Sequence, residues 1–180
     1  MIKKLFLCFI VLITLFSVAM YYYSTRKVMK EELPGSVSVE IPEGWNMTES
    51  LGNPEEGWTV SFKGANLSSM LTYMPLESAE LTYGTRDLEK IVNLRLQLIN
   101  ETSGGSYELV KAYSMKINGH DAKVTVVRIG PAEGSMLLVD VTWICDKTNR
   151  LFSFSTMMSD VGFEQRLRQL EETVKSVGCH

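Results

Sequence analysis

The 180-residue chain is 45% hydrophobic and 22% charged, with a formal net charge of −3. This length and composition predict one compact domain with an appendage and exclude a disordered chain. Five of the 18 basic residues and none of the 21 acidic residues fall within residues 1–30, so residues 31–180 carry a net charge of −8. An acidic body argues against nucleic acid as a partner, because phosphate binding needs a basic surface.

The N-terminal segment has the pattern of a membrane anchor. Lys3 and Lys4 precede an uncharged run at residues 5–23, which would form a helix of about 28 Å. A hydrocarbon core of about 30 Å can be crossed by such a helix, and tyrosines and basic residues follow it as at a membrane–water boundary. We therefore predict a signal anchor and tether in residues 1–30, inserted in the membrane through residues 5–23, and a separate domain in residues 31–180.

A cleaved signal peptide is the alternative, with Ser17-Val18-Ala19 as its cleavage site. The basic residues on the two sides of the apolar run nearly balance, so they set no clear orientation. Three Asn-x-Ser/Thr sequons, at Asn46, Asn66 and Asn100, are candidate glycosylation sites and favour an extracytoplasmic body. We predict a single-pass protein of the cell membrane with its body on the extracytoplasmic side.

The first half of the body combines short strands with one helix. Residues 24–35 are polar and are predicted to be a tether. Pro42-Glu43-Gly44 makes a turn that leads into Trp45. Apolar residues at three- and four-residue spacing predict a helix over residues 85–100, capped by Thr85. Period-two alternation predicts strands at residues 36–41, 58–62 and 69–75.

The second half is predicted to form two hairpins and a final helix. Asn118-Gly119 is a strong hairpin signal. The final helix would begin at Ser159 or Asp160, bury a stripe of residues four and three apart, and end at Gly178. The four strands of the hairpins are expected at residues 107–117, 122–129, 136–145 and 151–157.

Two residue types in these strands invite a functional interpretation that we do not prefer. His120 precedes Asp121, a pair that can act as a general base, but at a hairpin tip we expect a solvated turn residue. Methionines can bind copper, but on strands we expect them to fill gaps in the core. The methionines concerned are Met70, Met74, Met115, Met136 and Met157.

An alternating strand that runs into Ile41-Pro42-Glu43-Gly44-Trp45 resembles the opening of the PsbP family. The order of strands, middle helix, two hairpins and terminal helix is similar to that family over residues 36–178. The resemblance implies an α+β fold, in which helices pack on the faces of an antiparallel sheet as an α/β/α sandwich. It also implies a binding or assembly role instead of enzymatic activity, here in a membrane-anchored prokaryotic member.

Few residues carry chemistry. There is no G-x-S-x-G or H-E-x-x-H motif and no calcium-binding loop, so we predict no catalytic residue, no cofactor and no metal site. Cys145 and Cys179 can form one disulfide outside the cytoplasm, with two unpaired thiols as the alternative. Together with His180 they could also hold copper or zinc, which we rank well below the disulfide. Trp45 is expected to anchor the core, with ligand stacking as its alternative role.

These observations favour a membrane-anchored, extracytoplasmic, non-enzymatic binding or assembly module with a protein partner in the envelope. One alternative is an envelope-acting hydrolase, which would need a cleft where polar groups with displaced pKa values converge. The other is a small-molecule or metal carrier, which would need a cavity of about 300 Å³ or more between sheet and helix.

Overall fold

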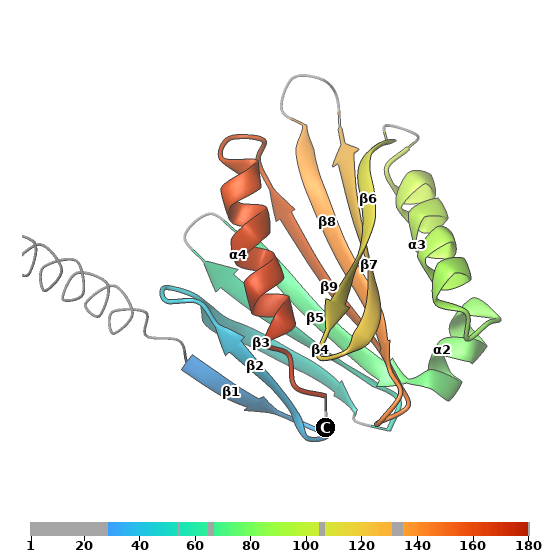
Figure 1. Cartoon of the computed structure of the whole chain (residues 1–180). Coiled ribbons are helices and arrows are strands. Elements are labelled where there is room, and N and C mark those ends of the chain that lie inside the picture. Colours follow the sequence, from blue (N-terminus) through green and yellow to red (C-terminus); the bar gives the residue numbers. More distant parts are fainter. Residues whose placement is uncertain (1–28, 54, 65–66, 105–106, 131–134, 180) are drawn as a thin grey trace, which may run out of the picture.

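A seven-stranded antiparallel sheet forms the centre of the molecule, with strand order β3-β4-β5-β9-β8-β7-β6 (Figure 1). The computed structural model describes residues 29–53, 55–64, 67–104, 107–130 and 135–179. The strands are β1 (Met29–Leu33), β2 (Val37–Ile41), β3 (Asn46–Asn53), β4 (Gly57–Gly64), β5 (Leu67–Pro75), β6 (Tyr107–Ile117), β7 (His120–Ile129), β8 (Met136–Cys145) and β9 (Arg150–Met158). The helices are α2 (Leu76–Tyr83), α3 (Leu88–Thr102) and α4 (Phe163–Lys175).

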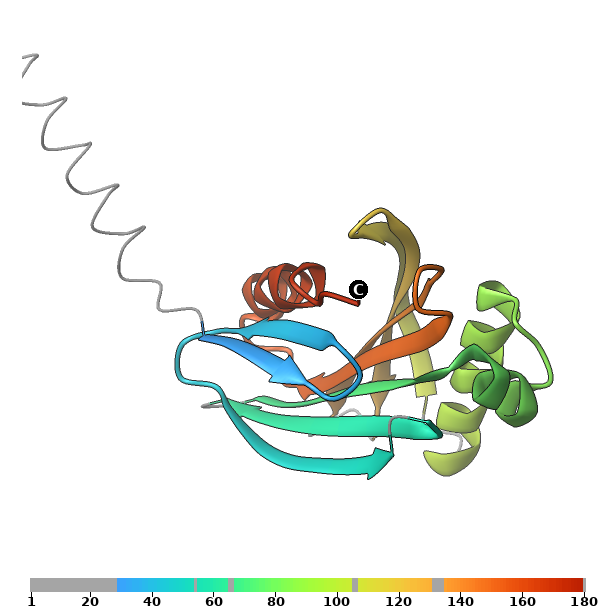
Figure 2. The ribbon, with the colours of Figure 1, turned by 90° about the horizontal axis from the view of Figure 1, so that it is seen from below.

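The sheet lies between two layers. Helix α4 and the β1–β2 hairpin lie on one side of it, and α2 with α3 on the other (Figure 2). This arrangement is the predicted α+β fold with helices on the faces of an antiparallel sheet. Within the described residues no helix is both long and apolar enough to cross a membrane. The predicted anchor and the cleavage site after Ala19 lie outside the described residues.

The main core fills the space between the sheet and the layer of α4. Trp143, Phe152 and Tyr73 stack in a row across β8, β9 and β5, with ring centroids 5.0 and 5.5 Å apart. The apolar stripe predicted for the last helix is buried against this face through Leu167 and Leu170. Strands β2, β4 and β5 and the two predicted hairpins are confirmed, because period-two alternation reports the face that is buried.

Three predicted features differ from the structure. Residues 29–33 were expected in the tether, but they form β1, which pairs with β2 and buries Leu33. Asp87 caps α3 in place of Thr85, because its carboxylate accepts the Lys90 N–H at 3.0 Å. Helix α4 starts after Gly162, which has φ 70°, so neither Ser159 nor Asp160 caps it.

Two further elements, β3 and α2, were not predicted either. Every residue of β3 is exposed, so the strand shows no alternation of buried and exposed positions. Helix α2 is only eight residues long and buries only Leu76 and Ala79, which leaves too short a pattern to recognise.

Candidate functional site

One half of the sheet is open to solvent on the side of α2 and α3. Helix α3 packs on β7 and β8, and α2 on the ends of β5 and β9, so β3 and β4 have no main helix contact there. The register places the outward side chains of these strands beside one another in a single layer. We call this surface the open face and define it by Leu51, Thr59, Ser61, Met70, Thr72 and Met157.

The open face combines apolar side chains with hydroxyl groups, and the same register places two exposed charges on it, Glu49 opposite Ser61 and Lys63 opposite Ser68. Leu51 is 58% exposed, Met70 44% and Met157 43%. Met70 lies opposite Ser155, and Met157 lies opposite Ser68, so the two methionines are diagonal neighbours within reach of each other. The hydroxyl groups of Thr59 and Thr72 are hydrogen-bonded at 3.2 Å. This pair lies between Leu51 and the two methionines. Such a surface offers large, adaptable apolar contacts within a polar surround.

These exposures correct the prediction that methionines on strands fill the core for three of the five residues, whereas Met74 and Met115 do pack against buried clusters. Met70, Met136 and Met157 are exposed, with Met136 at 36%. Alternation shows that a strand has a buried face, but it does not show whether the second face is also covered.

Strand β3 forms the edge of the sheet beside the open face. It pairs only with β4 in the described sheet, so one row of its N–H and C=O groups faces away from any strand. Two features of β3 could block its pairing with another chain. One is the bulge between Met47 and Glu49, and the other is the charged side chain of Glu49. The stretch from Ser50 to Asn53 carries neither of them.

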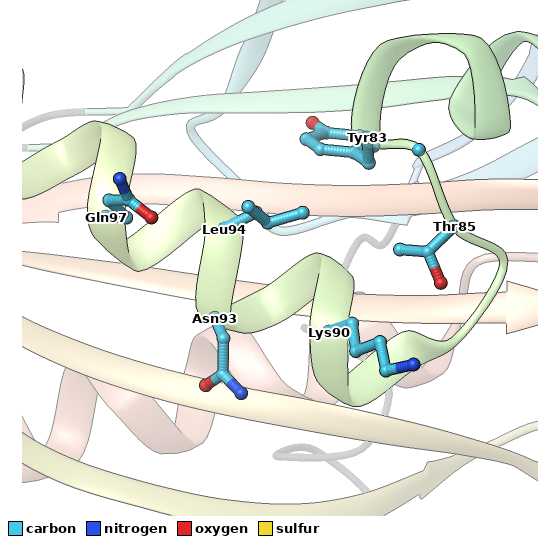
Figure 3. A pocket seen from close by; sticks show the side chains of 7 residues that line it. Tyr83, Thr85, Lys90, Asn93, Leu94 and Gln97 are labelled. Atoms are coloured by element: carbon cyan, nitrogen blue, oxygen red, sulfur yellow. The ribbon is translucent and has the colours of Figure 1, made fainter.

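A second surface feature is a shallow recess of about 370 Å³ on the solvent side of α3 (Figure 3). It is lined from α3 by Lys90, Asn93, Leu94 and Gln97, and from the end of α2 and the following loop by Tyr83, Gly84 and Thr85. Lys90 is the one ionisable side chain besides Tyr83, and no carboxylate, thiol or imidazole enters the recess. It lacks the acid–base pair that a hydrolase needs.

A buried ion pair joins α3 to the sheet. The Arg95 guanidinium donates to both oxygens of the Asp140 carboxylate, from Nη2 at 2.7 Å and from Nε at 3.1 Å. Ser153, Ser155 and Thr142 donate their hydroxyls to the same carboxylate.

Burial alone would raise the pKa of Asp140, but the Arg95 charge and these hydrogen bonds outweigh it and hold the pKa below its usual value. Burial would lower the pKa of Arg95, but the negative charge of Asp140 outweighs burial and holds that pKa above its usual value. The Asp140 carboxylate therefore holds α3 on the sheet and stays ionised in that role.

Sequence reasoning missed this pair, although a signal was present. Asp140 interrupts the nearly continuous apolar run at residues 136–144, where an ionised carboxylate needs a buried partner. Arg95 lies between the apolar positions of α3, on the side that faces the sheet. A carboxylate in an apolar strand and a guanidinium on the sheet-facing side of a helix together predict an ion pair between Asp140 and Arg95.

On the opposite face of the sheet, the structure joins the predicted pair of cysteines. Cys145 at the end of β8 and Cys179 in the C-terminal tail form a disulfide with a Cα–Cα distance of 6.6 Å. His120 lies beside them. The expectation that His120 is solvated was wrong, because its side chain is only 10% exposed.

The remaining predicted sites lie apart from one another. Asn46, at the start of β3, and Asn100, in α3, are exposed, and Asn66 lies outside the described residues. Trp45 is 8% exposed and packs so tightly on Gly64 that a Cβ there would lie 2.7 Å from its Nε1. The indole is therefore part of the core.

Comparisons with known proteins agree on the fold. Neither a family model nor a curated protein matches the chain. The solved structure of cyanobacterial PsbP from Synechocystis superposes with a TM-score of 0.64 at 12% identity, over 85% of this chain and 92% of its own. The Ran-binding protein Mog1p of Saccharomyces cerevisiae gives 0.57 at 12% identity, over 86% and 96%. The chain therefore has the PsbP-like fold, which the Ile41–Trp45 turn and the order of elements had indicated.

Proposed function

We propose that this chain is a membrane-anchored, extracytoplasmic and non-enzymatic module that binds a protein partner across the open face and the adjoining edge of β3. The observation that carries the proposal is the open face itself. It places three exposed apolar side chains, Leu51, Met70 and Met157, on the sheet beside its edge strand β3. Proteins with the same fold include one that binds Ran, which is consistent with a protein as the ligand.

The geometry favours a partner that contributes an extended segment. Such a segment can add to β3 through backbone hydrogen bonds, while its alternate side chains reach the open face. Because Thr59, Ser61 and Thr72 are half-buried hydroxyl groups between the apolar residues, the surface suits a mixed peptide better than a purely apolar one.

The titratable groups support a role without catalysis. Asp140 is committed to Arg95, and the recess on α3 holds no acid–base pair. Burial raises the pKa of Tyr73 to about 12, and the Tyr73 hydroxyl donates to the Pro34 carbonyl at 2.7 Å. The perturbed groups thus hold elements together and do not converge in a cleft.

A position-specific crosslinking experiment tests the binding surface. A photo-crosslinking amino acid at Leu51 or Met70 is expected to give the same protein adduct in native membranes, because both positions lie on the open face. At Arg168, exposed on α4 on the other side of the sheet, it is expected to give none. The readout is the mass and identity of each adduct.

A second variant ties the adduct to the surface. With the crosslinker at Leu51, Met70→Glu is expected to reduce the adduct at least tenfold, because a charge would be buried against the partner. Arg168→Glu is the matched control and should leave the yield unchanged. Adducts of equal yield at Leu51 and Arg168, or a product with twice the mass of this chain, would contradict a partner of different sequence on this face.

The proposed topology has its own test. Protease added to intact cells is expected to digest the body while residues preceding the apolar run stay protected, because the body would lie outside the membrane. Antibodies against tags at the two ends of the chain report which part survives. Digestion of the body only after the cells are lysed would place it on the cytoplasmic side and refute the topology.

A further inference from the structure

The β7–β8 pair brings His120 and Cys145 together. Ala122 lies opposite Trp143 in the register, so His120, two residues before Ala122, and Cys145, two residues after Trp143, come next on the same face of the pair. Side chains at opposite positions of an antiparallel pair have Cβ atoms about 4.5–5.5 Å apart. A histidine nitrogen, Cys145 Sγ and Cys179 Sγ all lie within 4.8 Å of one another.

The third member of this cluster is held in place without the disulfide. Gly178 and Ser38 exchange two backbone hydrogen bonds, at 2.8 and 2.9 Å, which fasten the C-terminal tail to β2. Asn118 Nδ2 donates to the Val177 carbonyl at 2.7 Å. The tail therefore presents Cys179 to Cys145 even when the S–S bond is open.

The imidazole of His120 has an arrangement typical of a metal ligand. Its Nδ1 lies 3.5 Å from a carboxylate oxygen of Asp146. Its Nε2 is buried and has no hydrogen-bond partner among the described residues. A buried ring nitrogen without a hydrogen-bond partner is costly unless something fills its place, and a metal ion held by this nitrogen would do so.

We propose that the reduced form of this cluster, His120 with the thiolates of Cys145 and Cys179, binds one soft, thiophilic metal ion of the Cu(I) or Zn(II) class. Two thiolates and one imidazole are the donors that these ions prefer. Metal–sulfur bonds of about 2.3 Å would set the sulfurs roughly 3.7 Å apart, within the span of the cluster. Since the sulfurs are the ligands, the same two residues form either a disulfide or a metal site.

The disulfide and the metal-bound form differ by two electrons. A dithiol reduces the Cys145–Cys179 bond, gives up two electrons and two protons, and itself becomes a disulfide. The metal ion then replaces the two thiol protons, which leave to solvent. A second disulfide rebuilds the Cys145–Cys179 bond by exchange: it takes two electrons from the thiolates and two protons from solvent, becomes a pair of thiols, and the metal ion is released.

Metal titration of the full-length protein tests the proposal. All samples carry Cys8→Ser, are held in detergent, and are reduced with dithiothreitol that is then removed under anaerobic conditions. Reduced protein is expected to bind one equivalent of Zn²⁺, or of Cu⁺ measured against a coloured chelator, and the two titrations show which ion it retains more tightly. The oxidised protein is expected to bind none.

The variants identify the ligands. His120→Gln is expected to weaken binding at least tenfold, whereas His180→Gln is the matched control and should leave it unchanged. X-ray absorption of the metal-loaded Cys8→Ser protein is expected to show two sulfur neighbours and one imidazole, which keeps the test valid if His120→Gln misfolds. Equal binding by the oxidised and reduced forms, a site lost in His180→Gln but kept in His120→Gln, or no imidazole neighbour would overturn the assignment.

Discussion

Replacing Arg95 with methionine is expected to lower the free energy of unfolding by about 3–5 kcal/mol. The variant leaves Asp140, which is 5% exposed, as a buried carboxylate without its cation. Three hydroxyl groups still donate to it, but hydroxyls do not supply a compensating charge. Chemical unfolding of the detergent-solubilised protein, followed by tryptophan fluorescence, measures the loss.

Two comparisons isolate the ion pair as the cause. Arg168→Met removes an equally long cation from an exposed site and is expected to change stability by less than about 0.5 kcal/mol. The double variant Arg95→Met/Asp140→Asn should lose less stability than Arg95→Met alone, because it leaves no buried charge behind. Equal losses in Arg95→Met and Arg168→Met would show that the pair contributes nothing.

The pair also predicts how stability depends on pH. The folded pKa of Asp140 is lower than that of an unfolded carboxyl, which is about 3.9. Its contribution is therefore fully present above that value and is lost as the pH falls through the lower, folded pKa. Asp140→Asn should remove this part of the acid denaturation. Asp121→Asn should change it much less, because Lys116, which lowers the pKa of Asp121, lies with it in solvent.

The sequence predicted the fold best where one face of an element is buried and the other is not. β2 and β4 alternate clearly, Asn118-Gly119 marks the turn between β6 and β7, and α4 carries its stripe at Leu167 and Leu170, so these elements were recognised. Strand β3 has no buried face, so its pairing with β4 could be found only in three dimensions.

The functional surfaces were harder to predict because they depend on long-range packing. The open face exists because α3 packs on β7 and β8, and nothing in Met70 or Met157 themselves records how far that helix reaches. His120 looked solvated beside Asn118-Gly119, but it is only 10% exposed, and Cys179 of the C-terminal tail lies within 4.8 Å of it. In contrast, Asp140 within an apolar strand is a local signal that could have been used.

Replacing both Cys145 and Cys179 with alanine is expected to lower the free energy of unfolding by about 3–4 kcal/mol. The two residues are 34 positions apart, and closing a loop of this length removes entropy of that size from the unfolded chain. The measurement is the midpoint of urea unfolding under oxidising conditions, with Cys8→Ser as the control that should not move it. Because the unfolded chain is the state affected, dithiothreitol should lower the midpoint of the wild type and leave that of the double variant unchanged.

The disulfide could instead stabilise the protein by holding the C-terminal tail in the folded state. The hydrogen bonds of the tail allow the two effects to be distinguished. Gly178 and Asn118 hold the tail through hydrogen bonds that do not involve sulfur. The amide protons of Ser38 and Gly178 are therefore expected to stay protected from exchange in the double variant under native conditions. If these amides exchange freely while the rest of the sheet stays protected, the disulfide fastens the tail in the folded state. If the midpoint does not change at all, the two cysteines are not joined in the protein.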